Sequence, residues 1–198
     1  MPRPDYERFV ATFGREPGSR YRCLCHKEGR EGDRFVHFFA KVEDVRTKSI
    51  QGHGCDYDFG LNIDIFPMDG KPESAELQKK RERQLTHWSH RLNICGTRFD
   101  LLNFHQPLFS KIEAHLRGAE HWWKLINEEV LKYPYESSRL VGAVSVTYNG
   151  TREIFERAML DEYVDLEFEG CTFKAFKRWN EWLIQEFGDY MTPPPEGR

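Results

Sequence analysis

The chain has 198 residues, of which 39% are hydrophobic and 31% are charged, with a formal net charge of −3. This length suits one domain with a sizeable core, and the weakly acidic balance argues against a nucleic-acid-binding protein. No stretch approaches the roughly 20 apolar residues of a membrane span, and the first residues lack the apolar core of a signal peptide. Five cysteines, an odd number, argue against a secreted disulfide framework. These features predict a cytoplasmic protein with reduced thiols and no transmembrane segment.

The N-terminal part of the chain predicts a helix followed by a hairpin. Pro4–Phe13 begins with a proline and carries apolar residues at helical spacing. Tyr21–Cys25 and Arg34–Val42 have the composition of strands, the second being rich in aromatic and β-branched residues. The charged, glycine-containing segment Lys27–Asp33 between them is predicted to be the turn.

The rest of the chain predicts a helical middle and a mixed C-terminal part. Gly60–Gly70 has the pattern of a strand, Pro72–Asn93 that of a long helix, and Ser110–Lys132 that of one or two further helices. Val164–Phe173 alternates apolar and polar residues up to a turn at its glycine, and Lys177–Phe187 reads as a helix that stops at a glycine. The expected fold class is α+β.

Asp64 lies in the middle of the Gly60–Gly70 segment, between two isoleucines. Alternation along a strand places Ile63 and Ile65 on one face and Asp64 on the other. An ionised carboxylate that is removed from water needs a cation, a metal ion or several hydrogen-bond donors. The strand alone leaves two interpretations open: a metal ligand, or a residue on the wet face of an edge strand.

The predicted strand before Asp64 ends in a second group of charged and hydroxyl residues: Lys41, Asp44, Arg46 and Thr47. Cations beside a metal-binding carboxylate suit a substrate that carries phosphates, because they neutralise the charge that develops during phosphoryl transfer. Loops that follow strands are commonly charged, however, so a solvated loop is the alternative interpretation.

Five residues form a candidate zinc-ligand set: Cys23, Cys25, His26, His53 and Cys55. Thiolates and imidazoles favour zinc, but a Cys-x-Cys pair on a strand directs both sulfur atoms to the same side, a spacing that is uncommon in structural zinc sites. Cysteines without a metal or a disulfide are often simply buried, and this is the favoured interpretation here.

Four blocks spread over nearly the whole chain have distinctive sequences. They are Met1–Phe9, Phe39–Thr47, Asn62–Asp69, and Phe168–Gly170 leading to Phe187–Pro194. The third contains Ile-Asp-Ile-Phe-Pro and the fourth contains Gly-Asp-Tyr-Met-Thr-Pro-Pro. In this order the blocks resemble the LicD family of phosphocholine transferases, whose relatives include the fukutin-type ribitol-phosphate transferases.

The resemblance implies a nucleotidyltransferase-like fold with a mixed sheet, a helical middle and a C-terminal helix. It implies transfer of phosphocholine, or a related phospho-alcohol, from CDP-choline or a similar CDP-alcohol to a cell-surface glycan such as lipopolysaccharide, teichoic acid or capsule. In that fold an Asp-x-Asp pair and a third carboxylate hold Mg²⁺ or Mn²⁺, and Asp64 matches the third carboxylate. Lys41 would contact the donor phosphates, with Asp44, Arg46 and Thr47 beside it as further substrate-binding residues. The resemblance places the reaction in the cytoplasm or at the inner membrane surface.

The chain departs from the family pattern at its N-terminus. In the family, an acidic run of the Asp-Asp-Asp-Ile-Asp type comes before the segment that aligns with Met1–Tyr6, and the present sequence starts after that run. Mg²⁺ needs several fixed anionic ligands. We therefore expect the single domain 1–198 to be N-terminally incomplete and inactive as it stands.

The alternative function is a non-catalytic glycan- or nucleotide-binding remnant of the family. Such a module would use exposed aromatic residues, and the candidates are Trp122, Trp123, Trp179 and Trp182. Their neighbours fit amphipathic helices, however, which favours a place in the core.

Overall fold

The computed structural model describes residues 1–26, 35–49, 59–97, 106–143 and 150–193. The helices are α1 (Arg3–Thr12), α2 (Ala75–Cys95), α3 (Leu108–Arg117), α4 (Ala119–Val130) and α5 (Trp179–Phe187), with 3₁₀ turns at Gly150–Glu153 and Arg157–Leu160. The strands are β1 (Tyr21–Leu24), β2 (Ala40–Asp44), β3 (Leu61–Ile65), β4 (Met68–Lys71), β5 (Leu140–Ala143), β6 (Phe155–Glu156), β7 (Tyr163–Phe168) and β8 (Cys171–Phe176). Helices and short sheets are thus combined, which confirms the α+β class.

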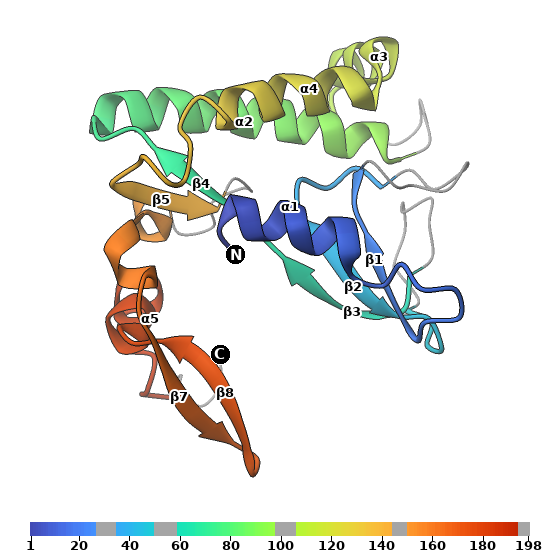
Figure 1. Ribbon diagram of the computed structural model, residues 1–198. Helices are drawn as coiled ribbons and strands as arrows, with labels where there is room; N and C mark the ends of the chain where they lie inside the picture. Colours follow the sequence, from blue (N-terminus) through green and yellow to red (C-terminus); the bar gives the residue numbers. More distant parts are fainter. Residues whose placement is uncertain (27–34, 50–58, 98–105, 144–149, 194–198) are drawn as a thin grey trace.

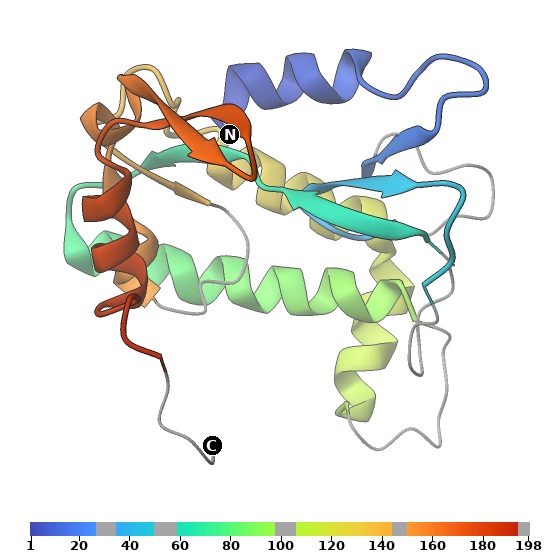
Figure 2. The same cartoon turned by 90° about the horizontal axis from the view of Figure 1, so that it is seen from below.

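The small sheet β1–β2–β3 lies between α1 on one side and the helices α2 and α4 on the other (Figures 1 and 2). The predicted opening helix is confirmed, and it buries Tyr6 and Val10, one helical turn apart. Both side chains pack against Cys23, Cys25 and Ala40 of the sheet region. This contact fixes one face of the sheet and leaves its charged face for other partners.

The predicted hairpin between the first two strands is confirmed, but its second strand is shorter than expected. β1 pairs antiparallel with β2, and β2 pairs antiparallel with β3. β2 begins at Ala40, whereas the sequence predicted a strand from Arg34, a residue outside the described part. The segment before β2 is held by its rings instead, because Phe38 packs on Trp123 and His37 stacks on Phe39. The predicted turn Lys27–Asp33 also lies outside the described residues.

The predicted helical middle is confirmed as α2, α3 and α4. Ser74 caps the N-terminus of α2, its side-chain oxygen accepting from the backbone N–H of Leu77. A core cluster joins α2 to α4, with Leu92, Trp122 and Ile126 almost completely buried. Trp122 is only 2% exposed, so it cannot stack on a glycan. The other tryptophans of the binding-module hypothesis are partly buried.

The C-terminal part also matches its prediction. β7 and β8 form a hairpin that turns at Gly170, where φ is +75°, and α5 ends at Gly188, where φ is +74°. Figure 1 shows this hairpin standing away from the body of the molecule. Within the described residues, none of the helices combines the length and the apolar character that crossing a membrane would require.

All strand pairs in the described residues are antiparallel, including those of the second sheet, β4–β5–β6. In the same residues, one parallel bridge joins Pro2 to Met68. Arg3, the next residue, donates from Nε to Oδ1 of Asp69 at 2.7 Å and also binds Oδ2 through Nη2. This ion pair joins the first and third sequence blocks. The nucleotidyltransferase-like arrangement of a mixed sheet remains a prediction.

Candidate functional site

Lys41 and Asp64 lie opposite each other on neighbouring strands. The register of β2 and β3 pairs these two residues, and alternation points both side chains to the same face of the sheet. Lys41 Nζ is 2.6 Å from Asp64 Oδ1 and also donates to Asn62 Oδ1 at 3.2 Å. Its ammonium lies over the rings of Phe39 and Phe59. The partner that the Asp64 carboxylate requires is therefore Lys41.

Asp64 stands at the open side of this face. Its side chain is 35% exposed, whereas that of Lys41 is 11% exposed. The opposite face of β3 is wetter than an apolar strand suggests, because Leu61 and Ile63 are 74% and 64% exposed. The strand pattern left two interpretations, a metal ligand and a residue on a wet face. In the described residues, Asp64 is a partly exposed carboxylate that is paired with an ammonium group.

The other predicted site residues do not join this pair. Asp44 points to the opposite face, where both Nε and Nη2 of Arg20 donate to its Oδ2 at 2.9 and 2.7 Å. This hydrogen bonding, mainly from Arg20, lowers the pKa of the Asp44 carboxyl. The backbone N–H of Arg46 also binds Asp44, while the Arg46 side chain points into solvent.

Thr47 lies at the corner where the end of β2, at Asp44, meets the start of β3, at Leu61. Its hydroxyl donates to the carbonyl of Asp44 at 2.8 Å and accepts from the N–H of Leu61 at 2.7 Å. Gly60 is adjacent, with space for no side chain. In the described structure Thr47 therefore holds the corner together, and it also lines a cleft.

Sequence reasoning missed Arg22 and Glu43. Glu43 is 2% exposed and lies on the same face of β2 as Lys41. Arg22 Nε donates to its Oε1, and the N–H of Gly60 donates to its Oε2 at 2.8 Å. The alternation from Lys41 to Glu43 was the available signal, but only the register of β1 against β2 places Arg22 opposite Glu43.

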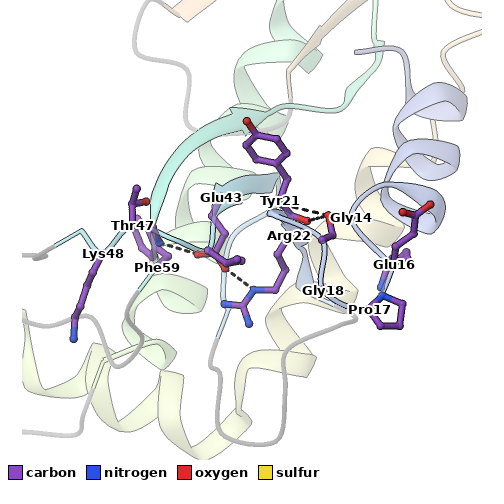
Figure 3. Close-up of a pocket in the computed structure, with 14 residues that line it drawn as sticks. Gly14, Glu16, Pro17, Gly18, Tyr21, Arg22, Glu43, Thr47, Lys48 and Phe59 are labelled. Atoms are coloured by element: carbon purple, nitrogen blue, oxygen red, sulfur yellow. Dashed lines mark hydrogen bonds and ion pairs between the residues drawn. The ribbon is translucent and has the colours of Figure 1, made fainter.

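An open cleft of about 650 Å³ is lined in part by Arg22 and Glu43. Figure 3 shows the Gly14–Gly18 loop on one side of it and the corner of Thr47 and Lys48 on the other, with Arg22 between them. Ligand sites of small molecules commonly have volumes of roughly 300–1,000 Å³. The cleft is thus large enough for a nucleotide-sized molecule.

The described residues do not fit the expected divalent metal. Among them, no group of three or more His, Cys, Asp or Glu side chains is arranged to hold a metal ion. Asp64 offers one carboxylate, and the Lys41 ammonium lies 2.6 Å from it. Mg²⁺ gives up its hydration reluctantly and takes several fixed oxygen ligands. The described residues around Asp64 therefore lack the ligand set of a Mg²⁺ site.

The described members of the candidate zinc set belong to different environments. Cys23 and Cys25 are buried under α1, and burial together with the neighbouring Cys25 raises the pKa of the Cys23 thiol to about 11. A protonated, buried thiol behaves as a core residue. His26 stacks on Trp123 and binds Glu120 through Nε2. His53 and Cys55 lie outside the described residues.

Because of His37, which lies close to the Lys41–Asp64 pair, we expect the stability of the fold to depend on pH. Burial lowers the pKa of His37 to about 4, with a further lowering by Lys41 that Asp64 opposes. The unfolded chain, with an ordinary pKa near 6.5, therefore binds the proton first as the pH falls. The stability that His37 contributes by staying neutral should be complete above about pH 6.5 and should decrease towards about pH 4.

The test compares the wild type with His37→Phe, which keeps a ring but has no titratable nitrogen. Between about pH 7.5 and about pH 4.5, the wild type should lose up to about 2 kcal/mol more unfolding free energy than the variant. Urea unfolding at both pH values measures this difference. Equal losses in the two proteins would contradict the prediction.

Together, fold and site define an α+β protein with a lysine–aspartate pair on one face of a small sheet, and with a ligand-sized cleft that is lined by Glu43 of the same face. The chain is 25% identical, over 208 aligned positions, to the lipopolysaccharide cholinephosphotransferase LicD of Haemophilus influenzae, and the match covers 99% of this chain and 73% of that protein. This similarity agrees with the resemblance to the LicD family that the four blocks carry. No family model matches the chain, and no solved structure matches it significantly.

Proposed function

We propose that this protein transfers phosphocholine, or a related phospho-alcohol, from a CDP-linked donor to a hydroxyl of a cell-surface glycan. The observation that carries the proposal is the similarity of 99% of the chain to a lipopolysaccharide cholinephosphotransferase. It is supported by the pairing of Lys41 with Asp64, since two separate blocks of the resemblance supply these residues and the fold brings them together. The proposed place of the reaction is the cytoplasmic side, at the inner membrane surface.

In this proposal the acceptor hydroxyl attacks the phosphorus atom that carries choline. The bond from that phosphorus to the oxygen of CMP breaks, and CMP leaves. Lys41 binds the phosphate oxygens and neutralises the charge that develops on them. The donor phosphate replaces Asp64 as the partner of Lys41, and the Asp64 carboxylate then accepts the proton of the attacking hydroxyl.

The test is a transfer assay with CDP-choline and lipopolysaccharide. Release of CMP should equal the choline found on the glycan by mass spectrometry. Asp64→Asn and Lys41→Gln should each reduce the rate by about 100-fold, the typical loss when one electrostatic or acid–base group is removed from a phosphoryl-transfer site. Lys174→Gln is the control, because this lysine is on the β7–β8 hairpin and 70% exposed. Full activity of Asp64→Asn would contradict the assignment.

A cofactor role for Mg²⁺ or Mn²⁺ is a separate proposal, supported by the family resemblance alone. The same assay tests it, with each metal added and with a chelator. Activity that survives the chelator unchanged would rule it out.

The second candidate function is a binding module that has lost the chemistry. It is favoured by one observation: among the described residues Asp64 is paired with an ammonium, and no set of three metal-ligating side chains surrounds it. Binding of CDP-choline without release of CMP, under conditions in which a LicD enzyme is active, would select this function.

A further inference from the structure

The cleft beside β1 carries positive charge that the proposed transfer site does not use. Its lining includes Arg15, Arg22 and Lys48, against the carboxylates of Glu16 and Glu43. Glu43 is almost fully buried and is neutralised by Arg22 and the N–H of Gly60. Among the described lining residues, three cationic side chains stand against two carboxylates, and this excess of cations favours an anionic ligand.

Arg22 is the best-positioned of these cations. Its Nε is held by Glu43, so the guanidinium plane has a defined orientation, and the Arg22 side chain remains 25% exposed. Within the described part of the chain, the two terminal nitrogens of Arg22 make no hydrogen bond, and in Figure 3 the group lies between Lys48 and the Gly14–Gly18 loop. A planar guanidinium with two outward N–H₂ groups matches the geometry of a phosphate.

Lys41 by itself does not supply enough positive charge for the whole donor. Its ammonium binds Asp64 and Asn62 and lies over two aromatic rings, with only 11% of the side chain exposed. A donor with two phosphates needs more than one cation. The exposed Lys48 and the oriented Arg22 are within the same cleft, whose size suits the whole nucleotide.

We propose that this cleft binds the diphosphate of the nucleotide donor through Arg22 and Lys48, and that Glu43 acts as a positioning residue for Arg22. The proposal rests on the proposed function, because it names where the donor of that reaction binds. The chemical class of the ligand is a nucleoside diphosphate ester, and its simplest fragment is pyrophosphate.

The experiment is calorimetric titration of CDP-choline, and separately of inorganic pyrophosphate, into the full chain at low ionic strength. Arg22→Gln alone would leave the buried Glu43 carboxylate without its guanidinium, so the variant used is Arg22→Gln/Glu43→Gln, in which the amide still accepts from Gly60. Lys48→Gln is the second, surface variant. Lys124→Gln on α4, 71% exposed, is the charge-matched control.

The Kd for both probes should rise at least about tenfold in the double variant and about threefold to tenfold in Lys48→Gln, and should be unchanged in Lys124→Gln. If the wild type binds CDP-choline and transfers phosphocholine while these variants bind CDP-choline normally, the proposed binding site in the cleft is wrong and the proposed function stands. If the wild type binds pyrophosphate in an Arg22-dependent way but transfers nothing, the cleft is supported and the proposed function fails. If the wild type binds neither probe, the proposal that the cleft binds a diphosphate is wrong.

Discussion

Replacing Arg3 with methionine should lower the unfolding free energy by about 3–5 kcal/mol, the typical result of removing one partner from a buried ion pair. Arg3 binds both carboxylate oxygens of Asp69, and the side chains are 13% and 3% exposed. Without the guanidinium, the buried Asp69 carboxylate would lose both of these hydrogen bonds and keep only the through-space attraction of the Met1 ammonium, Lys71 and Arg81. The pair also anchors the start of α1 to β4, so its loss should loosen the packing of α1.

Arg8→Met in the same helix is the matched control for this prediction. Arg8 is 77% exposed and pairs with Asp5, which is 49% exposed, so its removal should change stability by less than about 1 kcal/mol. Urea unfolding followed by circular dichroism measures both variants. Equal effects of the two substitutions would show that the Arg3–Asp69 pair contributes no more than a surface contact.

Gly60→Ala should destabilise the corner between β2 and β3 by about 3 kcal/mol, the upper range for overpacking a tight site. A Cβ at this position would lie 2.1 Å from the carbonyl oxygen of Asp44 and 2.8 Å from Thr47 Oγ1. That carbonyl cannot move easily, because both the N–H and the hydroxyl of Thr47 donate to it. The Gly60 N–H also binds Glu43, so the substitution should disturb the cleft as well.

Two measurements check the Gly60 prediction. Urea unfolding should show the loss of stability, and pyrophosphate titration should show weaker binding at a temperature where the variant is still folded. Val45→Ala is the control at the same cleft, because Val45 is 48% exposed and should change stability by no more than about 0.5 kcal/mol. A Gly60→Ala variant as stable as Val45→Ala would contradict the steric argument.

Local pattern was sufficient for most elements of the fold. The helical spacing in the segments that became α1, α2 and α4, the glycine that ends α5, and the alternation in β7 all depend on neighbouring residues. The strand boundary at Ala40 could not be predicted in this way. Phe35–Phe39 has strand composition, but its rings pack on distant partners such as Trp123, and β2 begins only after this segment.

The sequence by itself determined the α+β class, the family resemblance and the requirement that Asp64 find a partner, because periodicity, motif order and the cost of burying a charge are properties of short segments. Only the tertiary structure decided which partner each charge has. Strand register set Lys41 against Asp64 and Arg22 against Glu43, and it turned Asp44 away towards Arg20. Register depends on how separate strands align across loops, and a shift of one residue would exchange the two faces of the sheet.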